Sequence, residues 1–153
     1  MKRPLLKTSC TALGLFAMAG LGGCSDSGMH MTRTANAAAA LMSPPPAGYR
    51  KVSELVKLPD FLPGLGTLYV QPATLPAGPF LAYDRDGKLV STIYMIPLEE
   101  MNRHGRLDNL AAPGGRVDHV DFYYNAGHPG VEVPHYHVVL WHVPEADEAS
   151  VAR

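Results

Sequence analysis

The sequence predicts a small α+β domain dominated by an antiparallel β-sheet, with one or two short helices and a barrel-like closure of the sheet as one option. At least five short runs are rich in β-branched and aromatic residues, and glycine, proline and aspartate separate them. Only two short stretches show helical spacing or a helix start signal. At 153 residues, one compact domain is the natural expectation.

Turn residues delimit the predicted elements. Asp84-Arg85-Asp86-Gly87 predicts a hairpin turn. A first helix is expected over 52–56, where apolar residues recur at helical spacing before Pro59. A second helical turn is expected over 98–101, because Pro97 is suited to a helix start. The five expected strands are residues 67–70, 80–83, 89–96, 117–124 and 135–143.

The first 23 residues resemble a bacterial lipoprotein signal peptide. A basic start precedes an apolar run, 12–21, that is too short and too rich in glycine to span a bilayer. Leu21-Gly22-Gly23-Cys24 then has the small residues before cysteine that are typical of lipoprotein cleavage sites. We therefore expect Cys24 to become the acylated (for example palmitoylated) first residue of the mature chain. An ordinary secretory signal with a chance cysteine is the alternative.

The predicted lipid anchor indicates where in the cell the protein lies, and it excludes chemistry that depends on a thiol. Several acyl chains would bind the membrane durably, and Ser25 after Cys24 predicts the periplasmic face of the outer membrane in a Gram-negative cell. Cys10 would leave with the signal and Cys24 would carry lipid, so the folded domain has no thiol. Disulfides, thiol catalysis and cysteine-ligated zinc are thereby excluded.

The mature chain is expected to have three parts. Residues 24–47 hold the lipidated cysteine and a flexible tether rich in alanine and proline, 48–145 form the globular domain, and 146–153 form a disordered tail. Cleavage removes three basic residues, which leaves 10 basic against 14 acidic residues and a formal charge of −4. Such a balance predicts no nucleic-acid partner.

The last predicted hairpin is rich in histidine. Because side chains alternate along a strand, His119, Asp121 and Tyr123 share one face of its first strand, and His135 and His137 share one face of its second. If Tyr123 opposes His135, then Asp121 opposes His137 and lies close to it. The side chains of His119, Asp121, His135 and His137 could then converge on one point. The hairpin's histidines are His119, His128, His135, His137 and His142.

Convergent imidazoles and a carboxylate are ligands for a divalent metal. We predict zinc first and copper second, because imidazole suits both and no thiolate is present. His128 and Glu132, in the loop 125–133, are candidates for a fourth ligand or for a supporting partner. The predicted metal ligands are His119, Asp121, His135 and His137.

Two alternatives depend on how the strands pair. A slip by one residue would send His119 and Asp121 to the opposite face. His142 points away from the pair His135 and His137 in either case. Alternatively, the histidines are polar residues on a solvated face of the sheet. Tyr136, Val138 and Leu140 would then point inward.

Several short motifs resemble a known family. Residues 59–143 are similar to an uncharacterised bacterial domain family related to a sigma-E-controlled, ring-forming small protein of Thermus. The resemblance implies an α+β fold, an oligomeric ring in at least one member and no established activity. Relatives often carry a histidine at the position of Leu68, which would remove one possible metal ligand here. The motifs are 62–66 (LPGLG), 78–79 (GP), 87–89 (GKL), 94–96 (YMI) and 133–137 (VPHYH).

The histidine pair also resembles the cupin pattern, in which two such residues on one strand begin a metal site inside a barrel. A cupin would have a glutamate four residues after the second histidine, where this chain has Trp141. The resemblance is therefore partial.

Three functional hypotheses follow. The leading one is a non-catalytic, membrane-anchored envelope lipoprotein that binds zinc or copper for metal handling or stress protection, with no catalytic residue assigned. The second is a metal-dependent, cupin-like enzyme with Asp121 beside the histidine pair and His119 or Glu132 as general acid or base. The third is an oligomeric structural or stress-response protein that binds no metal.

Overall fold

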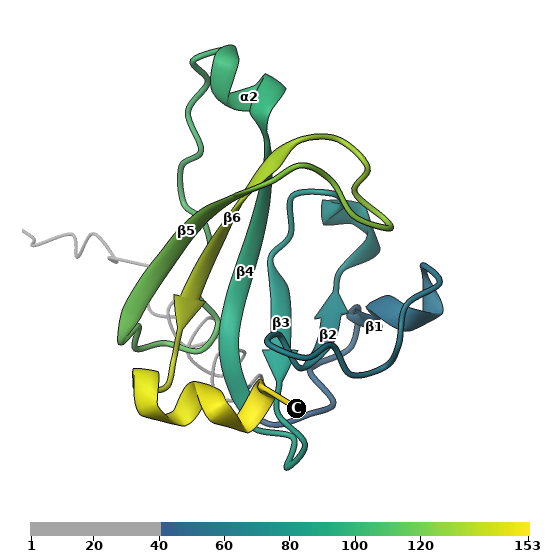
Figure 1. Ribbon diagram of the computed structural model, residues 1–153, viewed down its shortest axis with the longest axis vertical. Coiled ribbons are helices and arrows are strands. Elements are labelled where there is room, and N and C mark those ends of the chain that lie inside the picture. Colours follow the sequence, from purple (N-terminus) through teal and green to yellow (C-terminus); the bar gives the residue numbers. More distant parts are fainter. Residues whose placement is uncertain (1–40) are drawn as a thin grey trace, which may run out of the picture.

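The computed structural model describes residues 41–153 (Figure 1). The predicted signal peptide, the predicted lipidation site Cys24 and the predicted tether up to residue 40 lie outside the described residues. Over residues 41–153, the structure contains no helix with the length and apolar character that crossing a membrane requires.

The fold is a six-stranded antiparallel sheet with the order β1-β2-β3-β4-β6-β5. β1 and β5 are its two edges, so the sheet is open and the barrel-like option is wrong. The strands are β1 (Arg50–Lys51), β2 (Thr67–Val70), β3 (Phe80–Tyr83), β4 (Leu89–Pro97), β5 (His119–Asn125) and β6 (His135–Trp141).

The sheet matches the sequence expectation closely. β2 and β3 have the predicted bounds, and the hairpin turn between β3 and β4 lies at 84–87, where the Asp84 carboxylate accepts the amide hydrogens of Asp86 and Lys88. β5 and β6 are each shorter or shifted by one or two residues. β1 was not predicted, because a two-residue strand has no periodicity to recognise.

The helices are short. The expected helix at 52–56 is a single 3-10 turn, η1 (Val52–Glu54), and α2 (Leu98–Asn102) follows Pro97 as predicted. α2 ends before His104, whose φ of 53° lies in the left-handed region. Two further 3-10 segments, η2 (Pro72–Thr74) and η3 (Glu145–Val151), carry no helical pattern in the sequence.

The main core lies on one face of the sheet. Buried side chains from β2, β3, β4 and β6 form it together with Val131, Val143 and Val151, and partly buried apolar residues of the segment 52–65 pack against it. β4 runs through the middle of the sheet, and its residues Leu89 to Ile96 are all buried. Its apolar run without alternation is explained by this burial on both faces.

Both ends of the predicted domain extend further than expected. Leu41 and Ser43 pair through their backbones with the segment 87–89, so the tether prediction is wrong for these residues. The predicted disordered tail is also wrong: η3 lies across the lower end of the sheet (Figure 1), and Val151 is 1% exposed. The Gly64 amide donates to the Val151 carbonyl over 2.6 Å.

Candidate metal centre

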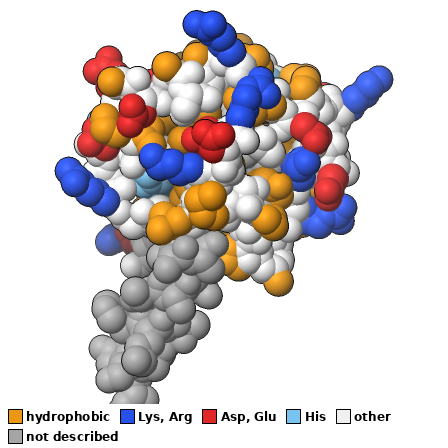
Figure 2. All heavy atoms as spheres, turned by 90° about the horizontal axis from the view of Figure 1, so that it is seen from below, with side chains coloured by type: hydrophobic (Ala, Val, Ile, Leu, Met, Phe, Trp, Pro, Cys, Tyr) orange, Lys and Arg blue, Asp and Glu red, His pale blue; other side chains and the backbone are white. Residues whose placement is uncertain are grey.

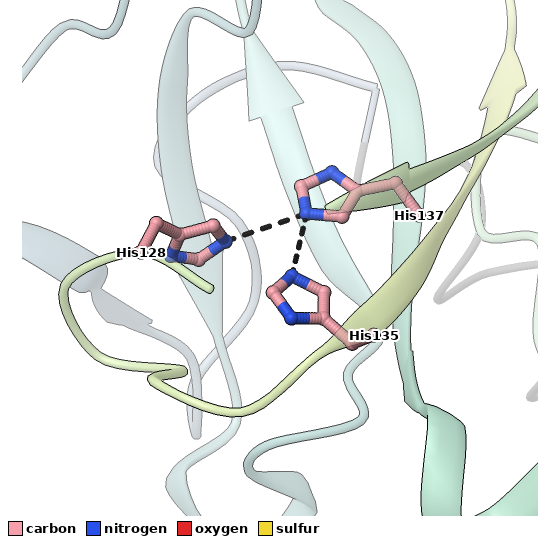
Figure 3. Close-up of side chains that lie close together, drawn as sticks. All are labelled: His128, His135 and His137. Atoms are coloured by element: carbon pink, nitrogen blue, oxygen red, sulfur yellow. Dashed lines mark hydrogen bonds between the residues drawn. The ribbon is translucent and has the colours of Figure 1, made fainter. Parts of the chain in front are cut away.

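Three imidazoles meet beside the core (Figure 3). His135 and His137 lie on the inward face of β6 and are 0% and 2% exposed, and His128 reaches them from the connection between β5 and β6. The Nε2 atom of His137 lies 2.9 Å from that of His135 and 3.3 Å from that of His128. The alternative of a solvated histidine face is therefore wrong.

A tight turn positions His128. His128 and Val131 exchange backbone hydrogen bonds of 3.0 and 2.9 Å around Pro129 and Gly130. Gly130 has a φ of +90°, and proline followed by such a glycine is the pattern of a type II turn. A Cβ at Gly130 would lie 3.2 Å from a methyl group of Val56, so the turn is seated closely on the segment after η1.

Backbone carbonyls determine the tautomers of two of these histidines. The Nδ1 atom of His135 lies 2.7 Å from the Val133 oxygen, and that of His128 lies 3.1 Å from the Pro129 oxygen. A carbonyl oxygen only accepts, so each Nδ1–H must donate. In this tautomer Nε2 of each ring carries a lone pair, and both Nε2 atoms lie within hydrogen-bond distance of the His137 Nε2.

His137 completes the group and has a side-chain partner. Its Nδ1 lies 3.0 Å from the Tyr123 hydroxyl, which can donate or accept. Burial, together with the nearby His135 and His128, lowers the pKa of His137 to about 4. His137 is therefore a neutral imidazole near neutral pH, which is the form that binds metal.

These residues could hold a metal ion. Their ligand atoms all lie within 4.8 Å of one another. An ion about 2.0–2.1 Å from each nitrogen in tetrahedral geometry would separate the nitrogens by about 3.3 Å, which is close to the distances observed here. Three protein ligands leave one position of four-coordinate zinc unfilled.

A cavity of about 490 Å³ adjoins two of the three histidines. His128 and His137 line one part of it, and Leu68, at the position where relatives are expected to carry histidine, lines another. Most of the remaining lining is aliphatic and comes from the segment 52–65, the strands β2 to β4 and the turn after His128. Among the described residues, no Asp, Glu, Lys or Arg lines this cavity.

The observed register separates His119 and Asp121 from this group. Tyr123 pairs with His137 and not with His135, so the predicted pairing is shifted by two residues. The predicted faces remain correct, because a shift of two keeps each side chain on its face. However, the shift moves His119 opposite Trp141, toward the far end of the strand pair.

His119 instead belongs to a second group. Its Nε2 lies 2.9 Å from a Glu148 carboxylate oxygen on η3, and its Nδ1 lies 3.2 Å from an Asp118 oxygen. Asp121 accepts a 2.8 Å hydrogen bond from the Trp141 indole. His119, Asp121 and Glu148 also have ligand atoms within 4.8 Å of one another. Because both ring nitrogens of His119 already face carboxylates, the arrangement is better explained as an ion pair that fastens η3.

The other predicted residues lie apart. Glu132 is exposed and does not line the cavity. His142 points away from the three histidines, as expected, with its Nε2 2.8 Å from the Thr92 hydroxyl and its Nδ1 2.8 Å from the Arg116 carbonyl oxygen. The cupin-like general acids or bases, His119 and Glu132, are thus not beside the cluster.

Two features of the site were not recognised in the sequence. The sequence predicts the correct face for Tyr123 but does not identify it as the partner of His137. The available signal was that Tyr123 lies on the same face of its strand as His119. The contribution of 52–65 to the cavity had no sequence signal, because it depends on contacts between distant segments.

The chain is similar to proteins whose function is not described. Residues 84–124 match the family described as TTHB210-like, hypothetical protein TTHB210. The crystal structure of hypothetical protein TTHB210 from Thermus thermophilus is similar to this chain, with a TM-score of 0.55 and 46% sequence identity. The match covers 62% of this chain and 93% of that chain. No curated protein is significantly similar. The matched family region ends at Tyr124, before the three histidines.

The ion pair of His119 predicts a pH-dependent stability. Hydrogen bonding to Asp118, then to Glu148, raises the pKa of His119. Because this pKa is raised on folding, the ion pair contributes fully to the free energy of unfolding below pH 6.5. This contribution is lost as the pH rises through the folded-state pKa of His119. Replacement His119→Gln should therefore lower the urea midpoint more at about pH 5.5 than at about pH 8.5. An equal loss at both pH values would contradict this ion pair.

Proposed function

The chain belongs to the TTHB210-like family, and we propose that it is a lipid-anchored cell-envelope protein that binds a divalent transition metal through His128, His135 and His137. One observation carries the proposal: three Nε2 atoms converge, while the opposite nitrogen of each ring has a hydrogen-bond partner. Partners of this kind orient imidazole ligands in metal sites.

Zinc is the first choice and copper the second. Three neutral imidazoles suit both ions, and the absence of a thiolate from the mature domain removes the ligand that would favour soft metals. Copper generally binds nitrogen ligands more tightly than zinc, so the supply of metal in the envelope would decide between them.

Metal binding is better supported than metal-dependent catalysis. His119 is engaged with Asp118 and Glu148, and Glu132 faces solvent, so neither is placed to act as acid or base at the three histidines. Figure 2 shows basic and acidic side chains interspersed on the face seen from below. On this face, therefore, the described residues form no basic patch of the kind that binds nucleic acid.

Removal of two ligands should abolish metal binding. The full chain carrying Cys24→Ser, which cannot be lipidated, is expected to bind one zinc ion per chain. The double variant His135→Ala/His137→Ala should bind no stoichiometric zinc, because a single imidazole remains at the centre. Isothermal titration calorimetry and metal analysis measure both.

A matched control removes two other histidines. His104 and His119 lie outside the cluster, so His104→Ala/His119→Ala should keep one zinc per chain. Equal zinc content in the two double variants would eliminate the proposed site.

The Tyr123 hydroxyl should contribute to metal affinity. When His137 binds metal through Nε2, its Nδ1–H can donate to Tyr123, and loss of such a partner typically weakens affinity about 10–100-fold. Tyr123→Phe should weaken zinc binding by that factor. Tyr124→Phe is the matched control, because Tyr124 lies on the opposite face of β5. Unchanged affinity in Tyr123→Phe would show that the hydroxyl has no such role.

A second candidate function, self-assembly, rests on a different observation. The outward face of the edge strand β5 exposes Val120, Phe122 and Tyr124, each by more than half. Phe122 stacks on Tyr136 of β6, with ring centroids 4.6 Å apart. Contiguous apolar side chains on an edge strand are typical of association surfaces.

Charge on this outward face should disrupt association. If the face joins copies of the chain, Phe122→Lys should shift the full chain (Cys24→Ser) to smaller species in sedimentation velocity. Leu107→Lys, a similarly exposed position outside the strand pair, serves as the control. A monomeric parent chain would contradict self-assembly and would leave the metal proposal unaffected.

A further inference from the structure

The cavity beside the three histidines has the dimensions of a ligand site. Small-molecule sites in proteins measure about 300–1,000 Å³, and this cavity measures about 490 Å³. Two of the three imidazoles, His128 and His137, line it, so an ion held by the cluster would lie at its wall. A ligand inside the cavity would then lie beside the ion.

The charge of the site favours an anionic ligand. Neutral imidazoles do not compensate the two positive charges of a zinc ion, and no acidic side chain lines the cavity among the described residues. An uncompensated charge beside apolar groups is costly. An anionic fourth ligand, such as a carboxylate or a hydroxide, would supply part of the missing negative charge.

The remaining walls favour an apolar body on that ligand. Leu55, Leu58 and Leu65 contribute from the segment that covers the sheet, and Phe80 and Met95 contribute from β3 and β4. The polar side chains in the lining, Tyr123 and Asn125 with the two histidines, come from β5, β6 and the connection between them. One part of the cavity is thus polar and the rest is aliphatic.

We propose that the metal-loaded cavity binds amphiphilic monocarboxylates, with the carboxylate on the ion and an aliphatic tail among the leucines. The inference rests on the proposed metal function, because the ion supplies the charge that selects the carboxylate. Burial of each methylene should raise the affinity by about fourfold, so affinity should increase with chain length until the cavity is full.

Calorimetry with three probes tests the inference on the full chain carrying Cys24→Ser. Decanoate should bind the zinc-loaded chain at least about tenfold more tightly than the metal-free chain, since the ion holds the carboxylate. It should also bind at least about 100-fold more tightly than acetate, which lacks the tail. Decanol, which has the tail without the charge, should show no dependence on zinc. In the cobalt(II)-loaded chain, decanoate should change the visible spectrum.

A substitution in the cavity lining tests where the aliphatic tail of decanoate binds. Leu58 is half-buried in the lining, so Leu58→Trp should fill part of the cavity and weaken decanoate at least about tenfold while zinc affinity stays unchanged. Leu107→Trp, at an exposed position outside the lining, is the matched control. Unchanged decanoate affinity in Leu58→Trp would overturn the cavity as the site.

The possible failures are distinct. If zinc does not bind, the proposed function falls and this inference falls with it. If zinc binds but decanoate binds no better than acetate, or equally well without zinc, only the carboxylate inference is overturned.

Discussion

The position of β6 between β4 and β5 is the constraint on which the candidate site depends. Both neighbours hydrogen-bond to β6, and the alternate side chains on its core-facing side are buried. His135 and His137 occupy two of these inward positions and lie on the core side together with Val139 and Trp141. Buried imidazoles are tolerated only when their nitrogens have partners, and that requirement explains the contacts with the Val133 carbonyl and the Tyr123 hydroxyl.

Rigid and irregular backbone each supply part of the candidate metal centre. The strand fixes the spacing of His135 and His137, whereas His128 depends on a turn whose proline and glycine allow few conformations. Contact of this turn with Val56 joins the centre to the segment that encloses the cavity. The same contact therefore connects the turn that carries His128 with an apolar wall of the cavity.

The strand pair β5–β6 carries two histidine groups with different chemistry. Near one end, His128, His135 and His137 face one another, and burial lowers the pKa of His137. Near the other, His119 lies between two carboxylates and holds the C-terminal segment η3. Carboxylates favour a protonated imidazole and burial favours a neutral one, so residues of one type on one face acquire opposite preferences from their surroundings.

Local sequence signals were sufficient to predict β2 to β6, the hairpin turn before β4 and the face on which each histidine of the last hairpin lies. Strong periodicity and turn residues are local signals, so 67–70 and 80–83 could be predicted with their bounds. Tertiary structure alone decided that His128, and not His119 or Asp121, joins the pair His135 and His137. A period of two specifies a face but is unchanged when a strand slides by two residues, so register depends on contacts outside the hairpin. The packing of the C-terminal segment η3 and the formation of the cavity walls also depend on contacts between distant segments. No local sequence pattern predicts such contacts.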